Sequence, residues 1–179
     1  MPRVDDDGFW TLIDQCAATG GGSSVEAQII AVTTALGALP DADVRRFDRR
    51  LRAQVARAND WRLWAAGYLA AGGMSDDAFT DFRVWLVYRG RATFERVLAD
   101  PDSLADLAWS EDGEDFADAE ELLYVPGEVL ESRGREEDDE DGVALGGAPT
   151  GDRFPEDDDA WFAAALPRLW ARKERAAGA

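Results

Sequence analysis

The sequence has 179 residues, 46% of them hydrophobic, and carries a formal net charge of −18 at pH 7. It contains no histidine and a single cysteine, which excludes histidine-dependent catalysis, zinc sites built from imidazole or several thiolates, and an internal disulfide. No stretch approaches the roughly 20 apolar residues of a membrane span, and the amino terminus lacks the basic-then-apolar order of a secretory signal, so we expect a cytoplasmic protein.

Apolar residues at helical spacing predict two helices before Pro40. The first follows Asp5–Asp7, which complement its positive end, and stops at Gly20–Gly22, with Cys16 as a small buried side chain. Ser23 and Glu26 have the spacing of a capping box for the second helix, which Pro40 closes.

The third helix begins near Asp41, and arginines flank its apolar face. We interpret them as a solvated face whose long side chains cover apolar surface. A site for phosphate or for an acidic partner is the alternative interpretation. These arginines are Arg45, Arg46, Arg49, Arg50, Arg52 and Arg57.

A pair of glycines separates two aromatic helices. Asp60 is placed as the N-cap of the first, which carries Trp61, Trp64 and Tyr68, and Gly72–Gly73 is a typical C-terminal stop. Ser75 caps the second, which ends at Gly90 after its own series of rings. A short sixth helix then runs up to Asp100–Pro101.

Acidic residues gather in the last part of the chain, since residues 101–179 hold 23 of the 37. A seventh helix is predicted from Phe116 to about Val129, kinked at Pro126 because proline lacks the N–H that a helix interior needs. Residues 132–155 are interpreted as a linker, and a last helix is expected from about Asp157. The acidic run Glu136–Asp141 in the linker is expected to be solvated, with docking on the third-helix arginines as the alternative.

No alternating strand pattern persists anywhere in the chain. We therefore predict an all-α protein, a compact bundle of about six to eight short helices with an acidic, partly disordered C-terminal segment. The expected organisation is a helical domain over residues 1–131, the linker 132–155, and a helix in residues 156–179 that packs back on the body.

Several short motifs resemble a bacterial family described only as a domain of unknown function (DUF4240 type). The resemblance covers roughly residues 5–131 and implies no activity, substrate or cofactor. Two positions depart from it: Met74, where similar chains often have cysteine, and Pro126, where they usually have a helix former. The motifs are Phe9-Trp10-x-Leu12-Ile13, Leu39-Pro40, Trp61-x-Leu63-Trp64-Ala65-Ala66-x-Tyr68-Leu69, Gly72-Gly73-x-Ser75-Asp76-Asp77-x-Phe79, Phe82-Arg83-x-Trp85-Leu86, Asp100-Pro101-Asp102-Ser103-Leu104 and Glu120-Glu121-Leu122-Leu123-Tyr124-Val125.

The turn between the two aromatic helices is the best candidate site. Its residues have a plain structural interpretation, because a glycine stop, a serine cap and first-turn carboxylates are what two successive helices need. The functional interpretation is a partner surface on which aromatic rings supply contact area and carboxylates fix orientation. The candidate binding residues are Asp60, Trp61, Trp64, Tyr68, Ser75, Asp76, Asp77 and Arg83.

The sequence favours binding over catalysis. Our first hypothesis is a non-enzymatic protein-interaction or regulatory module without a cofactor, for instance one that neutralises a toxin; it follows from the abundant rings, the acidic surface and the lack of a recognisable catalytic set. A carboxylate-metal hydrolase that uses Asp76, Asp77 and Asp81 is one alternative, because Asp77 and Asp81 share a helix face. An acidic mimic of nucleic acid is another, since the net charge repels nucleic acid itself.

Overall fold

The computed structural model describes residues 4–19, 24–109, 115–135 and 145–177. Helices dominate these ranges, which contain no strand and only an isolated parallel bridge between Asp60 and Thr150. The predicted all-α class is confirmed. In chain order the elements are α1 (Asp6–Thr19), α2 (Val25–Gly37), α3 (Asp41–Arg57), α4 (Trp61–Ala71), α5 (Asp76–Val87), α6 (Arg91–Ala99), the 3-10 helices η1 (Pro101–Asp106) and η2 (Ala119–Leu123), α7 (Val125–Glu131), α8 (Asp159–Ala165) and α9 (Pro167–Ala177).

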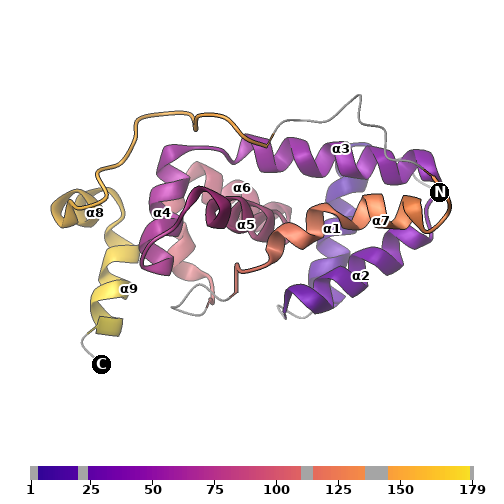
Figure 1. Ribbon diagram of the computed structural model, residues 1–179. Helices are drawn as coiled ribbons and strands as arrows, with labels where there is room; N and C mark the ends of the chain where they lie inside the picture. Colours follow the sequence, from indigo (N-terminus) through magenta and orange to yellow (C-terminus); the bar gives the residue numbers. More distant parts are fainter. Residues whose placement is uncertain (1–3, 20–23, 110–114, 136–144, 178–179) are drawn as a thin grey trace.

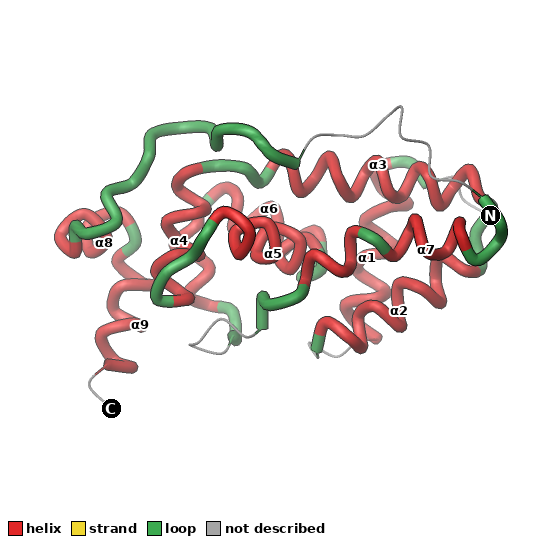
Figure 2. The backbone as a smooth tube through the Cα atoms, viewed as in Figure 1, coloured by secondary structure: helices red, strands yellow, loops and turns green. Residues whose placement is uncertain are grey.

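The helices follow one another along the length of the molecule (Figure 1). At one end α2 packs between α1 and α7, and α3 lies against α7. In the middle α5 contacts α3, α4 and α6, and α9 closes the other end by packing on α4 and η1. A long loop before α8 passes the start of α4 (Figure 2), so the C-terminal residues return to the helical body. No helix in the described ranges combines the length and apolar character needed to cross a lipid bilayer.

The central helix is α5, because every residue from Phe82 to Tyr88 is buried. A series of ring contacts begins on α4 and continues along α5. We call this series the aromatic column. Centroid distances along the column run from 4.7 to 6.3 Å, which is the range of favourable ring pairs. Its members are Trp61, Trp64, Phe79, Phe82, Trp85 and Phe116.

Local signals placed the helix ends around the glycine pair correctly. Asp60 accepts from the N–H groups of Arg62 and Leu63 and caps α4, and the Ser75 hydroxyl accepts from Ala78 N and caps α5. Gly72 ends α4 in the left-handed conformation, with φ of 68°. The N-cap of α2, however, is Ser24, which accepts from Ala27 N; the predicted Ser23 lies outside the described residues.

The prediction of one kinked helix over residues 116–129 is wrong. The chain forms η2 and then α7, and Pro126 lies in the first turn of α7. An N–H at that position has no partner within the helix, so proline costs nothing there and its fixed φ favours the helix start.

Both ends of the expected linker are bound to the helical body. Arg133 donates to the carbonyls of Leu36, Gly37 and Leu39 at 2.9–3.1 Å and so caps the C-terminus of α2. Phe154, near the other end, is buried. Partial disorder is therefore not confirmed for residues 145–177, while the run Glu136–Asp141 lies outside the described residues.

The left-handed stop of α4 yields a stability prediction. Gly72→Ala should lower the free energy of unfolding by about 1 kcal/mol, because a Cβ strains this conformation although no atom crowds it. Gly37→Ala is the matched control: Gly37 ends α2 with ordinary φ and open space, so alanine should be neutral or stabilise by up to about 1 kcal/mol. Urea unfolding followed by circular dichroism compares the two, and equal effects would contradict the assignment.

Candidate functional site

Two polar members of the predicted site, Asp60 and Ser75, cap helices. Asp60 Oδ1 accepts from Arg62 N at 2.9 Å and Leu63 N at 3.3 Å, and Oδ2 accepts from the hydroxyl of Thr150 at 3.0 Å. Ser75 Oγ accepts from Ala78 N at 3.2 Å. Their hydrogen bonds hold the starts of α4 and α5, as the structural interpretation of the turn anticipates.

Arg83 is buried and does not reach the turn surface, being only 3% exposed. Its guanidinium donates to the carbonyls of Val55 and Leu145 at 3.3 Å and to Thr80 Oγ1 at 2.9 Å. Burial lowers the pKa of Arg83 to about 10, so the group stays charged at neutral pH. No carboxylate in the described ranges pairs with it, and its partners are main-chain oxygens and one hydroxyl.

The three aspartates of the hydrolase hypothesis are not gathered around one point. Asp76 and Asp77 are exposed in the first turn of α5, whereas Asp81 Oδ1 accepts from Glu120 N at 2.7 Å and joins α5 to η2. Burial raises the pKa of Asp81, a rise that this hydrogen bond opposes and the nearby carboxylates reinforce. Among the described residues, no group of three or more carboxylates or thiols could hold a metal ion.

The predicted aromatic residues lie together and face the C-terminal part of the chain. Trp61 stacks on Trp64 at 4.9 Å, and Trp64 Nε1 donates to the carbonyl of Met74 at 3.2 Å. Phe154 contacts the rings of Trp61 and Tyr68 at 6.0 and 5.3 Å, and Tyr68 also stacks on Phe162. The surface expected to receive a partner is therefore occupied by residues of the same chain.

Four of the α3 arginines are paired with carboxylates, as a solvated face predicts. The pairs are Arg46–Asp43, Arg50–Asp6, Arg52–Asp48 and Arg57–Glu95. Arg46, Arg49 and Arg50 line an open hollow of about 400 Å³, but ion pairs already engage two of them. These contacts favour the structural interpretation over a phosphate site.

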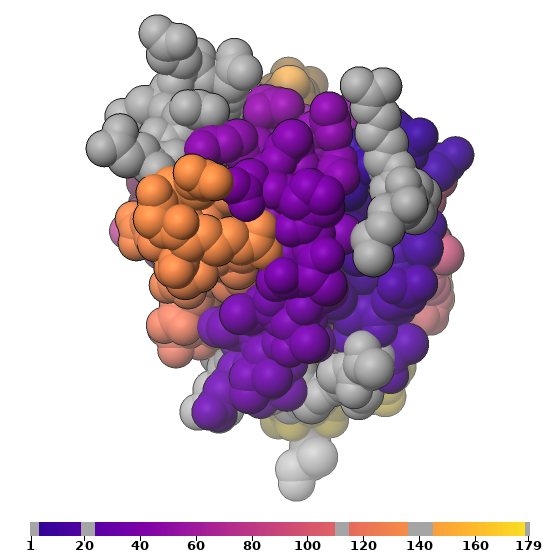
Figure 3. All heavy atoms as spheres, turned by 90° about the vertical axis from the view of Figure 1, so that its right-hand side faces the viewer, coloured from indigo at the N-terminus to yellow at the C-terminus, as the bar shows by residue number. Residues whose placement is uncertain are grey.

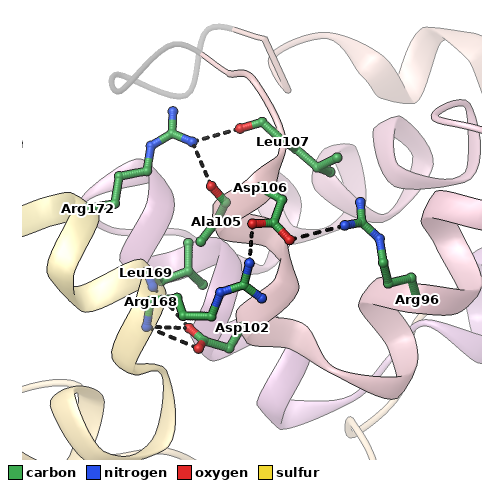
Figure 4. Close-up of polar contacts among 8 residues, drawn as sticks. All are labelled: Arg96, Asp102, Ala105, Asp106, Leu107, Arg168, Leu169 and Arg172. Atoms are coloured by element: carbon green, nitrogen blue, oxygen red, sulfur yellow. Dashed lines mark hydrogen bonds and ion pairs between the residues drawn. The ribbon is translucent and has the colours of Figure 1, made fainter.

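A polar network that the sequence did not predict fixes α9 on η1 (Figure 4). The buried Asp102 carboxylate accepts from the N–H groups of Arg168 and Leu169 at 3.0–3.1 Å and so acts as a remote N-cap of α9. Asp106 pairs with both Arg96 and Arg168. One signal was available in the sequence: Leu166 before Pro167 offers no side-chain acceptor, so the cap has to come from elsewhere.

The C-terminal part of α9 and the start of the loop after η1 are joined by Arg172. Its guanidinium lies 3.6 Å from the centroid of the Trp109 ring and donates to the carbonyls of Ala105 and Leu107. Beside it, α4 and α9 border an open apolar hollow of about 300 Å³, and the ionisable groups that line it among the described residues are Arg172 and Lys173. This lining offers no carboxylate, hydroxyl or thiol for catalysis.

A helix with a single charged residue lies at the opposite end of the molecule. Figure 3 shows this helix, α2, in the middle of one face, between α7 and α1. Ile30 on α2 is 61% exposed, the most exposed large hydrophobic side chain of the described residues, and Glu26 is the only charged residue of the helix. Ile30 was not among the predicted site residues, since nothing in the sequence of α2 marks which of its apolar side chains faces outward.

Comparison with known proteins gives one match. A family model described as "Protein of unknown function (DUF4240)" matches residues 4–132, which include α1 to α7 and exclude α8 and α9. No curated protein and no solved structure matches the chain.

The network on α9 predicts unequal effects of two neighbouring aspartates. Asp102→Ala should lower the free energy of unfolding by about 2–3 kcal/mol, because it leaves the buried N–H of Leu169 and the partly buried N–H of Arg168 without an acceptor. Asp106→Ala removes only half-exposed ion pairs and should cost at most about 1 kcal/mol. Urea unfolding of both variants checks the difference; a larger effect for Asp106 would contradict the remote cap.

Proposed function

The chain belongs to the DUF4240 family, and the region that matches the family model contains α2 and α7. We propose that the protein is a non-enzymatic protein-binding module that uses the α2 face to bind a basic partner protein. The observation that carries the proposal is the exposure of Ile30 on a helix with one charged residue, in a chain of which 31% is charged. We take Ile30 as the apolar anchor of a contact, because a few large side chains supply most of the binding energy at protein interfaces.

The surroundings of Ile30 have the composition of an interface centre. The other exposed residues of α2 are Glu26, Thr33, Thr34 and Gly37, of which only Glu26 carries a charge. Charged residues are depleted at the core of protein interfaces, because their desolvation costs free energy that contacts seldom return.

Charge complementarity identifies the chemistry of the partner. Glu128 and Glu131 are exposed on α7, the helix beside α2, and neither forms an ion pair with a described residue. Together with Glu26 and the net charge of −18, they favour a partner whose apolar contact is bordered by lysine or arginine. Regulation of such a partner, including neutralisation of a toxin, requires no catalytic group.

The residues proposed from the sequence play a smaller part in this function. Asp60 and Ser75 cap helices, Arg83 is buried, and Trp61 and Tyr68 contact the C-terminal segment. Asp76 and Asp77 remain exposed and are free to contribute to a second contact region. A metal-dependent hydrolase finds less support, because Asp81 is engaged by Glu120.

Substitution of Ile30 tests the proposed function. Ile30→Lys replaces the apolar centre by a charge that repels a basic partner, so affinity for a protein captured from the organism of origin should fall at least about tenfold. Its melting temperature should change little, since the side chain is exposed. Ala171→Lys, which adds the same charge at an exposed position of α9, is the matched control and should retain the partner.

The capture is measured at about 0.15 M and 0.5 M salt, because binding of a basic protein weakens as its charge is screened. A basic captured protein that is lost with Ile30→Lys and kept with Ala171→Lys supports the proposal. Equal capture by both variants contradicts it, and capture that depends on residues 136–144 instead favours the nucleic-acid mimic.

A further inference from the structure

Residues 145–158 lie on the body in the manner of a bound peptide. They contain no helix, and the bridge to Asp60 is formed by main-chain hydrogen bonds in both directions: Thr150 N donates to Asn59 O, and Trp61 N donates to Thr150 O, each at 2.9 Å. Asn59 Nδ2 adds a bond to the carbonyl of Gly147 at 3.2 Å. Main-chain pairing of an extended segment is a common mode of peptide recognition.

A single ring anchors this segment. Phe154 is 4% exposed and contacts Trp61 and Tyr68 of α4, while Trp161 and Phe162 of α8 complete its surroundings at 6.3 and 5.8 Å. A buried aromatic anchor surrounded by rings is typical of the residues that dominate binding energy. Leu145 supplies a second fixed point, since its carbonyl accepts from both terminal nitrogens of Arg83.

The receiving surface and the segment come from different parts of the chain. Asn59, Trp61, Tyr68 and Arg83 lie inside the region that matches the family, whereas residues 145–162 follow its end at residue 132. The hydrogen-bonding groups and rings of this surface thus belong to the family region, and the segment that satisfies them does not.

We propose that the corner of α3 and α4 is a peptide-binding site, occupied here by the chain's own residues 145–162, and that it binds an extended peptide of the pattern Thr-Gly-x-x-Phe from another protein. Threonine is required because its hydroxyl donates to Asp60 Oδ2 and its main chain pairs with Asn59 and Trp61. Glycine is required next because Gly151 has φ of +80°, a backbone conformation that residues with a Cβ rarely adopt. Phenylalanine fills the ring pocket.

Attachment to the same chain gives the segment a high effective concentration at the site, in the millimolar range for a short connection. A free peptide of micromolar affinity therefore does not displace it. Release of the segment by substitution should uncover the site without changing the receiving residues.

The test uses the full-length chain and a labelled synthetic peptide spanning residues 145–162, with binding followed by fluorescence anisotropy. Phe154→Ala removes the anchor, and Gly151→Val strains the exposed loop, so both variants should bind the peptide at least about tenfold more tightly than the unaltered chain. Asp157→Ala, an exposed position, is the control and should behave as the unaltered chain. A peptide with alanine in place of Phe154 should not bind either variant.

Folding of each variant is checked by circular dichroism. If Phe154→Ala unfolds, the result for Gly151→Val tests the proposal, because residue 151 is exposed on the loop and lies outside the core. Folded variants that do not bind the peptide overturn the proposal, as does an unaltered chain that binds equally well. Unfolding of Gly151→Val also overturns it, since the segment would then be an integral part of the fold. Ile30→Lys should leave peptide binding unchanged, which separates this site from the α2 face.

Discussion

Rings at every third position of α5 contact a ring of α4 on one side and Phe116 on the other, so the second half of α5 is surrounded by protein. The aromatic column therefore fixes α4 and α5 relative to each other. Large rings bury more apolar area per residue than aliphatic side chains do, and their stacked or edge-on geometry restricts how α4 and α5 can be oriented. Trp61, at the end of the column, is also where the C-terminal segment attaches.

The extent to which sequence predicts this structure depends on the distance over which a signal acts. Asp60, Gly72 and Ser75 were identified correctly because a cap and its N–H or carbonyl partners lie within a few residues. Asp102 caps a helix whose first residues lie 66 positions away, and Arg133 caps α2 from 96 positions away. Such partners are brought together by the packing of the helices, and a local sequence pattern does not predict them.

The candidate site also combines features that a local pattern predicts with features that only the packing of the helices decides. Composition correctly grouped Trp61, Trp64 and Tyr68, because rings at helical spacing share a face. Arg83 was included among the candidate binding residues of the turn, but its side chain is buried in the structure. Ile30 was not predicted, because the sequence does not show which apolar residues remain uncovered once the helices have packed.

Carboxylates have two separate uses in this chain. Asp60, Asp102 and Asp158 accept main-chain N–H groups at helix starts, where an anion also meets the positive end of the helix dipole. Glu26, Glu128 and Glu131 make no such contact and add to the field around α2. The acidic composition thus contributes both to folding and to long-range attraction, and the two contributions reside in different residues.

Arg83 binds the C-terminal segment through the main chain of that segment. Both of its terminal nitrogens point to the carbonyl of Leu145, a group that every amino acid possesses. The guanidinium therefore binds the main chain at residue 145, and this contact does not depend on the side chain at that position. Substitution of the Leu145 side chain therefore leaves both hydrogen bonds available, as long as the path of the main chain stays fixed.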